Sequence, residues 1–240
     1  MCGRYSLTSP PEAMVRLFGL ETTPNWPARY NIAPTQMAPV VVAGAAGGRA
    51  ARLMRWGLIP GWAKDPTMGA RMINARAETV AEKPSFRAAF RKRRCLVPAD
   101  GFYEWTGAKG AKQPYRIEQE GREPFAFAGL HELWSPGGEE PVKSYTIITT
   151  DAGPALKSIH HRMPVIVPPQ AFDAWLDETA SPDALHRVLE AATDTELTAF
   201  MVSKRVNNVR HDDADCLAPL DDTSAAINNE DDENEEGRLL

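Results

Sequence analysis

Residues 95–105, CLVPADGFYEW, contain two short runs of strand-forming residues, CLVPA and GFYEW. Three more runs of this kind follow at the spacing of β-hairpins, with glycine-rich turns between them. These runs are QPYRIE (113–118), PFAFAGL (124–130) and SYTIITT (144–150). Short runs bounded by turn residues are typical of antiparallel strands. The segment 95–150 therefore predicts a mostly antiparallel sheet.

Further strands and helices are expected on both sides of this segment. SPPEAMVRLFGL (9–20) predicts a first helix with Met14, Leu17 and Phe18 on one face, because they recur at helical spacing. Ser9 is expected to cap this helix and Gly19 to end it. The other expected elements are strands at 37–43, 51–60 and 198–202, a loop at 29–36 (RYNIAPTQ), and short helices at 84–95, 168–176 and 181–192.

A helix followed by many strands and then by helices is the element order of an α+β protein. We expect a single compact domain with a barrel-like, mostly antiparallel sheet and flanking helices. No boundary between two cores is visible in the sequence. The hydrophobic fraction of 43% is ordinary for a globular protein and supplies enough apolar side chains for one sizeable core.

The three cysteines, Cys2, Cys95 and Cys216, are odd in number and far apart in the sequence. They match neither a disulfide framework nor the paired spacing of a zinc site. No apolar run is long enough to span a bilayer, and no charged and then apolar leader opens the chain. We therefore expect a reduced cytoplasmic protein with no metal, no cofactor and no membrane partner.

Acidic residues are concentrated at the carboxyl end of the chain. The net charge is −5, but the residues from Asp221 onward hold eight acids and one arginine, so the preceding residues carry +2. Residues 221–240 have too little apolar content to fold and are predicted to be disordered, which leaves 2–220 as the folded domain. The tail either serves solubility or competes with nucleic acid for a basic groove.

Four polar segments contain side chains that a hydrophobic core does not require. They are MCGRY (1–5), INARAET (73–79), PADGFYEW (98–105) and SIHHRMPVIV (158–167). Each has an ordinary structural alternative. Position 2 can be a frayed end, Asn74 a turn residue, and Glu104 the solvent-facing position of a strand. A histidine before a strand can be a structural residue, and HHR is too short for a metal-binding tract.

Seven motifs occur in order along the chain: MCGRY, RYNIAPTQ, RWGLIPGWA, INARAET, CLVPADGFYEW, IHHRMPVIV and VSKRVNNVR. Together they resemble the SOS response-associated peptidase (SRAP) family, the abasic-site processing proteins, over residues 2–220. The resemblance implies a compact α+β fold with a positively charged DNA channel. It also implies that the protein recognises abasic sites in single-stranded DNA and links to them covalently in the DNA damage response. Lyase activity and a self-processing peptidase activity, the removal of Met1, belong to the same expectation.

The same resemblance assigns four catalytic positions. Cys2 is the nucleophile, and Asn74 (in NAR), Glu104 (in YEW) and His160 (in IHxRMP) line the site. Side-chain chemistry adds a hypothesis for DNA binding, because guanidinium groups can bind phosphates beside the lesion and indole rings can stack on bases. The residues expected to bind DNA in this way are Arg4, Arg76, Arg162, Trp62 and Trp105.

The chemistry of an aldehyde explains why a cysteine is useful at position 2. Once Met1 is removed, Cys2 carries an α-amine and a thiol on one residue. An abasic deoxyribose exists partly as an open aldehyde, which an amine attacks to form a Schiff base. An α-amine titrates near about 7.7–8.0, against about 10.4 for lysine, so more of it is free base at neutral pH. The thiol can then add to the same carbon and close a five-membered thiazolidine ring.

Two functions from other classes remain open. One is an amino-terminal-nucleophile cysteine hydrolase or peptidase, which also needs Met1 removed but turns over repeatedly without DNA. The other is a non-covalent single-strand binding module, which tolerates the loss of Cys2 and binds intact DNA as well. For the abasic-site function we expect a monomer, associated with the nucleoid in the cytoplasm, whose partner is single-stranded DNA.

Overall fold

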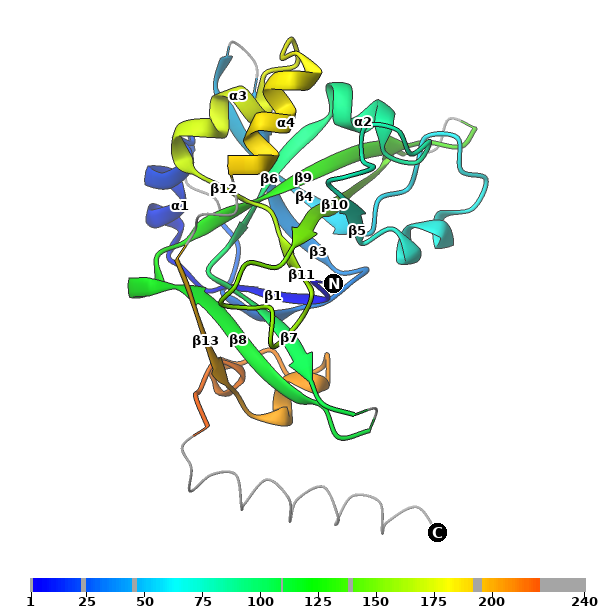
Figure 1. The fold of residues 1–240 in the computed structure, drawn as a ribbon. Coiled ribbons are helices and arrows are strands. Elements are labelled where there is room, and N and C mark those ends of the chain that lie inside the picture. The colour runs from blue at the N-terminus through cyan, green and yellow to red at the C-terminus, as the bar shows by residue number, and fades with distance from the viewer. Residues whose placement is uncertain are drawn as a thin grey trace.

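Two mostly antiparallel β-sheets form the centre of the fold, and short helices flank them (Figure 1). The computed structural model describes residues 2–22, 25–44, 47–108, 110–137, 140–191 and 196–220. Met1 and the tail predicted to be disordered, 221–240, lie outside the described residues. The prediction of an α+β fold with a barrel-like, mostly antiparallel sheet is confirmed.

The larger sheet closes into a barrel in the strand order β10-β4-β3-β6-β9, because β9 pairs in turn with β10. Only the contact between β10 and β4 is parallel within this ring. Three short strands, β5, β11 and β12, pair with β10 or β9. The bounds are β3 Met37–Ala43, β4 Arg49–Trp56, β5 Asn74–Arg76, β6 Arg94–Ala99, β9 Phe125–Trp134, β10 Val142–Asp151, β11 Arg162–Pro164 and β12 Ile166–Val167.

The smaller sheet contains the amino-terminal strand β1 between two antiparallel partners that are distant in sequence. Its order is β13-β8-β7-β1-β2, and every neighbouring pair is antiparallel. The register of β1 against β7 sets Arg4 opposite Tyr103 and Tyr5 opposite Phe102. The strands are β1 Arg4–Leu7, β2 Arg29–Ile32, β7 Gly101–Thr106, β8 Gln113–Gln119 and β13 Leu197–Met201.

The α-helices of the described residues form where the sequence predicts them. The first helix buries Met14 and Phe18, leaves Leu17 partly buried, and ends at Gly19 in the left-handed conformation (φ 60°). None of the described helices has the length and hydropathy of a membrane-spanning segment. The bounds are α1 Pro11–Phe18, α2 Arg87–Lys92, α3 Phe172–Leu176 and α4 Pro182–Ala191.

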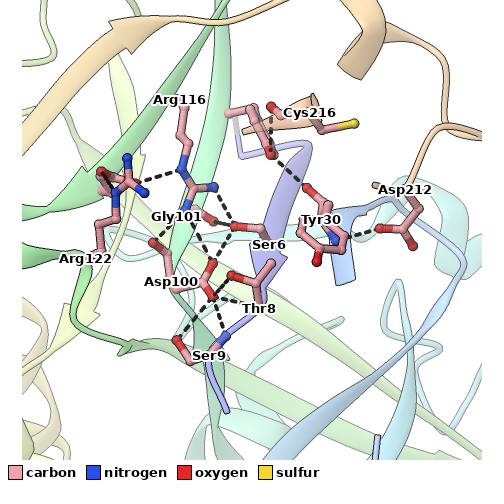
Figure 2. Close-up of polar contacts among 12 residues, drawn as sticks. Ser6, Thr8, Ser9, Tyr30, Asp100, Gly101, Arg116, Arg122, Asp212 and Cys216 are labelled. Carbon is pink, nitrogen blue, oxygen red and sulfur yellow. Dashed lines mark hydrogen bonds and ion pairs between the residues drawn. The ribbon is translucent and has the colours of Figure 1, made fainter. Parts of the chain in front are cut away.

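Two sequence-based expectations are wrong in detail. Ser9 does not cap α1, because its backbone N and its hydroxyl both donate to Asp100 Oδ2, at 2.8 and 3.2 Å (Figure 2). Residues 29–36 are not a simple loop, since 29–32 form the strand β2. A distant residue supports this strand: Asp212 Oδ1 accepts from the backbone N of Tyr30 and Asn31, at 2.5 and 2.9 Å.

Strand β1 joins the smaller sheet to the barrel. The ring of Tyr5 packs edge-on against Trp56 with centroids 5.2 Å apart, and its hydroxyl lies 2.6 Å from that of Tyr145. Phe127 of the barrel packs edge-on against Tyr5 and Phe102. All these rings are fully buried. The contacts fix the position of β1, and therefore of the residues that precede it, against the barrel core.

Candidate active site

Cys2 is buried in the hydrophobic core, so the alternative of a frayed end is wrong for this residue. Its thiol lies 3.8 Å from the carbonyl oxygen of Arg4, the first residue of β1. Burial raises the pKa of the Cys2 thiol well above its ordinary value, and the charge of Glu104 raises it further. The thiol is therefore neutral at physiological pH.

Glu104 is also buried, with 5% of its surface exposed, so the solvent-facing alternative is wrong. Side chains alternate along β7. Tyr103 packs in a cluster with the carboxyl-terminal segment, whereas Phe102 packs in the main core. Glu104 lies two residues after Phe102 and therefore on the same face of β7. Burial raises the pKa of Glu104 to about 7, and the amino terminus and Lys112 oppose this shift. A carboxyl group with this pKa can both donate and accept a proton near neutral pH.

Asn74 opens the short strand β5, which pairs in parallel with β10. Its Nδ2 donates to the carbonyl oxygen of Ile73 at 3.0 Å. Its Oδ1 is buried and accepts no hydrogen bond from the described residues. Buried acceptors are normally satisfied, so this oxygen is positioned to accept a donor from outside the described structure. Arg76 follows on the same strand and is exposed.

His160 lies in the turn before β11, and its imidazole stacks on His161 with centroids 4.4 Å apart. His160 Nδ1 lies 3.0 Å from the backbone N of Arg162 and 3.1 Å from the carbonyl oxygen of the same residue, so these contacts are compatible with either neutral tautomer. Burial lowers the pKa of His160, and the amino terminus lowers it further. The ring is therefore a neutral hydrogen-bond donor at pH 7.

Three of the four expected catalytic residues, Cys2, Glu104 and His160, have pKa values that are shifted by one another or by Lys112. Glu104 acts on Cys2, and Lys112 lowers the pKa of both Glu104 and His160. Asn74 enters from the neighbouring element, because β5 and β11 both pair with the carboxyl-terminal half of β10. Cys2, Glu104 and His160, which are far apart in sequence, are thus linked electrostatically, and Asn74 lies on a strand that shares the partner β10 with β11.

A cleft of about 480 Å³ opens beside this site. Arg4 and Trp105, both expected to bind DNA, line it, and the Arg4 guanidinium lies 5.8 Å from the centroid of the Trp105 ring. Sequence reasoning missed Lys112 and Lys204, which give the same cleft two further positive charges. Lys204 belongs to the VSKRVNNVR motif, which was the available signal.

Two expected DNA-binding residues lie outside the lining of this cleft. Trp62 is 57% exposed and lines a different groove, of about 670 Å³. Arg162 is 8% exposed, and its guanidinium donates to Glu78 at 2.8 and 3.0 Å and to Asp151 at 2.6 Å. A phosphate would have to displace a carboxylate to reach the Arg162 amino groups.

Among the described residues no group of three or more His, Cys, Asp and Glu side chains could hold a metal ion.

The fold and the buried amino-terminal segment define a β-barrel protein with a polar site at its first strand. The chain belongs to the SOS response associated peptidase (SRAP) family, which it matches over residues 1–209. The abasic site processing protein YoaM of Bacillus subtilis is 40% identical over 222 residues, 90% of this chain and 97% of its own. The abasic site processing protein HMCES of Gallus gallus is 36% identical over 224 residues, 80% of this chain and 66% of its own.

Solved structures share the fold. A protein from Bacteroides thetaiotaomicron superposes with a TM-score of 0.79 at 23% identity, over 91% of this chain and all of its own. A protein from Bordetella bronchiseptica superposes with a TM-score of 0.68 at 28% identity, over 84% of this chain and all of its own. The family seen in the sequence motifs and the architecture seen in the structure therefore agree.

Proposed function

We propose that this protein processes abasic sites in single-stranded DNA by linking Cys2 covalently to the sugar aldehyde. The observation that carries the proposal is the buried Glu104, with a pKa near 7, acting on the buried thiol of Cys2. The names of the relatives, abasic site processing proteins, give the substrate class. The link shields the lesion during the DNA damage response.

The reaction needs no oxidant and releases one water. Removal of Met1, which we assign to self-processing, exposes the α-amine of Cys2. The amine adds to the aldehyde carbon to give a carbinolamine, which loses water and becomes an imine. The S–H group then adds across the C=N bond: the sulfur bonds to carbon and the proton goes to nitrogen. The product is a thiazolidine, and ring closure ends the imine that would otherwise permit strand cleavage, the lyase reaction.

Each polar side chain has a role in this sequence. Asn74 Oδ1 accepts a hydrogen bond from the α-amine, which orients the amine without charging it. Glu104 donates a proton when the carbinolamine loses water and takes one from the thiol at ring closure, as its pKa near 7 permits. The neutral His160 imidazole donates a hydrogen bond to the sugar oxygen as the deoxyribose ring opens.

The raised pKa of the Cys2 thiol sets the order of the steps and argues against the hydrolase alternative. A cysteine hydrolase uses a thiolate, whose pKa is lowered by a neighbouring positive charge or a helix amino terminus. Here burial and Glu104 raise the pKa instead. The amine therefore attacks first, and the thiol reacts only when Glu104 takes its proton.

The cleft beside the site is the proposed path of the DNA strand. Arg4 lines it with Lys112 and Lys204, so it is suited to a phosphate backbone, and the Trp105 ring is suited to stack on a base. Arg76 on β5 is exposed, and we assign it a phosphate contact outside this cleft. We assign exposed Trp62 to a DNA contact farther from the lesion, and Arg162 could bind a phosphate there only in exchange for Glu78 or Asp151.

A denaturing gel with a single-stranded oligonucleotide that holds one abasic site tests the proposal. The wild-type protein, shown by intact mass to lack Met1, should give a gel-stable adduct, and intact DNA should give none. Cys2→Ala should give no stable adduct, while Cys2→Ser should leave an imine that borohydride traps. Cys95→Ala, which removes another fully buried thiol, is the matched control and should crosslink normally. A normal adduct from Cys2→Ala would refute the proposal.

A further inference from the structure

One fully buried side chain, Asn31 of β2, joins three separate motifs of the sequence beside the cleft. Its Oδ1 accepts a hydrogen bond from Arg4 Nη1 at 2.8 Å. Its Nδ2 lies within hydrogen-bond distance of three carbonyl oxygens of the carboxyl-terminal segment, those of Val206, Asn208 and His211, at 3.1, 3.2 and 2.8 Å. Every polar atom of this amide is thus used inside the protein.

The same segment holds the two groups that line the cleft. Arg4 Nη1 donates to the carbonyl oxygen of Val206 at 2.7 Å, and Arg4 Nη2 donates to that of Asn207 at 3.3 Å. Trp105 Nε1 donates to Asn207 Oδ1 at 2.7 Å. Together with the bond to Asn31 Oδ1, these contacts occupy three of the five N–H donors of Arg4. Two N–H donors therefore remain for a phosphate. The guanidinium is thus held by the backbone carbonyls of Val206 and Asn207, and the indole ring by the side chain of Asn207.

The backbone of Asn31 is held as firmly as its side chain. Asp212 accepts from the backbone N of Tyr30 and Asn31, and it forms an ion pair with Arg29. The hydroxyl of Tyr103 on β7 donates to the carbonyl oxygen of Tyr30 at 2.7 Å. Asn31 therefore cannot move without disturbing β2, and it is a rigid point from which Arg4 and 206–208 are placed.

We propose that Asn31 is a positioning residue for DNA binding: its amide clamps 206–208 and Arg4 together, and so presents Arg4 and Trp105 to the DNA strand. The inference rests on the proposed function and deepens it, because it names the buried group that orients the phosphate-binding arginine of the cleft. Asn31 itself is fully buried and does not touch DNA.

The test measures affinity for a single strand that contains a tetrahydrofuran abasic analogue, which has no aldehyde and cannot react. Asn31→Ala should weaken binding by about tenfold, the loss of one charge-assisted contact. It should also lower the slope of log affinity against log salt by about one unit, since one phosphate contact is lost. The single-turnover crosslinking rate at saturating protein should stay at the wild-type value.

A double-mutant cycle separates positioning from mere stabilisation. If Asn31 acts partly through Arg4, the double variant Asn31→Ala/Arg4→Ala loses less affinity than the sum of the two single losses. Losses that add, or an unchanged salt slope in Asn31→Ala, would overturn the proposal. Natural abasic DNA with wild-type protein is run in parallel. A missing adduct there refutes the proposed function, whereas a normal adduct with unaltered Asn31→Ala binding refutes the clamp alone.

A second variant keeps the test decisive if Asn31→Ala fails to fold. Asn207→Ala removes only the acceptor that holds the Trp105 indole. It should weaken binding severalfold with an unchanged salt slope, because stacking and not charge is affected. Val209→Ala is the control, because this exposed apolar side chain in the same segment has no part in the clamp. Wild-type affinity in Asn207→Ala would contradict the clamp.

Discussion

Two buried acids, one just before β7 and one in the carboxyl-terminal half of this strand, lie four residues apart and behave in opposite ways. Asp100, just before β7, is surrounded by donors: Ser6 Oγ at 2.6 Å, Thr8 Oγ1 at 2.8 Å and the guanidinium of Arg116 at 3.4 Å (Figure 2). Burial alone would raise the pKa of Asp100, but these hydrogen bonds and the charge of Arg116 lower it. Burial dominates at Glu104 and raises its pKa to about 7.

The end of β7 near Asp100 stabilises the fold, whereas the end near Glu104 is suited to proton transfer. Arg116 lies directly over Gly101, where an added Cβ would come within 2.5 Å of its Cζ atom. The guanidinium also donates to Ser6 Oγ at 2.7 Å and to Glu118 at 2.8 Å. This network ties β1, β7 and β8 together and so fixes the register that brings Cys2 to Glu104. Proton transfer needs a carboxyl group whose charge is not stabilised in this way.

The largest effect is expected at the stabilising end. Asp100→Ala should lower the free energy of unfolding by about 3–5 kcal/mol, because it leaves the buried charge of Arg116 with one carboxylate fewer. Urea unfolding at pH 7 measures this loss. Arg122→Ala is the control, since its ion pair with Glu118 is 71% exposed on the arginine side and should contribute little. Equal stability of the two variants would remove the distinction between the two ends.

Glu104→Gln should stabilise the protein, and the gain should depend on pH. The native state binds the Glu104 proton more tightly than the unfolded chain does, so wild-type stability falls as the pH rises from 4.5 to about 7. Glu104→Gln does not lose stability in this way, so its free energy of unfolding should exceed that of the wild type by about 2–3 kcal/mol at pH 8. Urea unfolding of both proteins at pH 5 and pH 8 measures it. The stability that Asp100 contributes changes with pH in the opposite direction, since it is lost as the pH falls through the lowered pKa of Asp100.

Arg76 and Arg162 differ in the same way, one suited to function and the other to stabilising the fold. Arg76 is exposed, so Arg76→Ala should leave stability unchanged and reduce the salt slope of DNA binding by about one unit. Arg162 is held by Glu78 and Asp151, so Arg162→Ala should lower the melting temperature. Binding at four salt concentrations and thermal unfolding of both variants measure this. An unchanged slope in Arg76→Ala would show that Arg76 makes no phosphate contact.

The smallest effect is expected from Lys112, whose charge lowers the pKa of Glu104. Lys112→Ala should raise the pKa of Glu104 by less than about one unit and should not alter the pKa of Asp100. Carboxyl titration by NMR, with each glutamate and aspartate assigned, follows both groups. A shift at Asp100 with none at Glu104 would contradict the separation of the two ends.

Local pattern did not predict the short strands β1 and β5. It was sufficient for the helices and most other strands, because their hydrophobic spacing and turn residues lie within a few positions of one another. The strand at 29–32 could not be predicted in this way. Its Asn31 reads as a turn residue, and its partners in Asp212 and the segment 206–211 lie far along the chain. The Ser9 cap was wrong for a similar reason, since Asp100 competes for its hydroxyl.

The candidate site was named from motif order, and the structure adds what spacing does not contain. Burial of Cys2 and Glu104 and the unmatched Asn74 Oδ1 are tertiary facts. So is the pairing of Arg162 with Glu78, which lies 84 residues away and turns an expected phosphate ligand toward a carboxylate. Lys112 lies next to the predicted strand at 113–118, but nothing in its local sequence relates it to His160.

The pH dependence of crosslinking tests the central claim, that Glu104 carries protons at Cys2. Single-turnover rates at saturating protein are measured from pH 5 to pH 9 on abasic single-stranded DNA. The wild type should give a bell, rising as the α-amine loses its proton and falling as Glu104 loses the proton needed for carbinolamine collapse. Glu104→Gln should react about 10²–10⁴-fold more slowly, without the falling limb near pH 7, while binding DNA with little change. Wild-type rates in Glu104→Gln across this range would contradict the account.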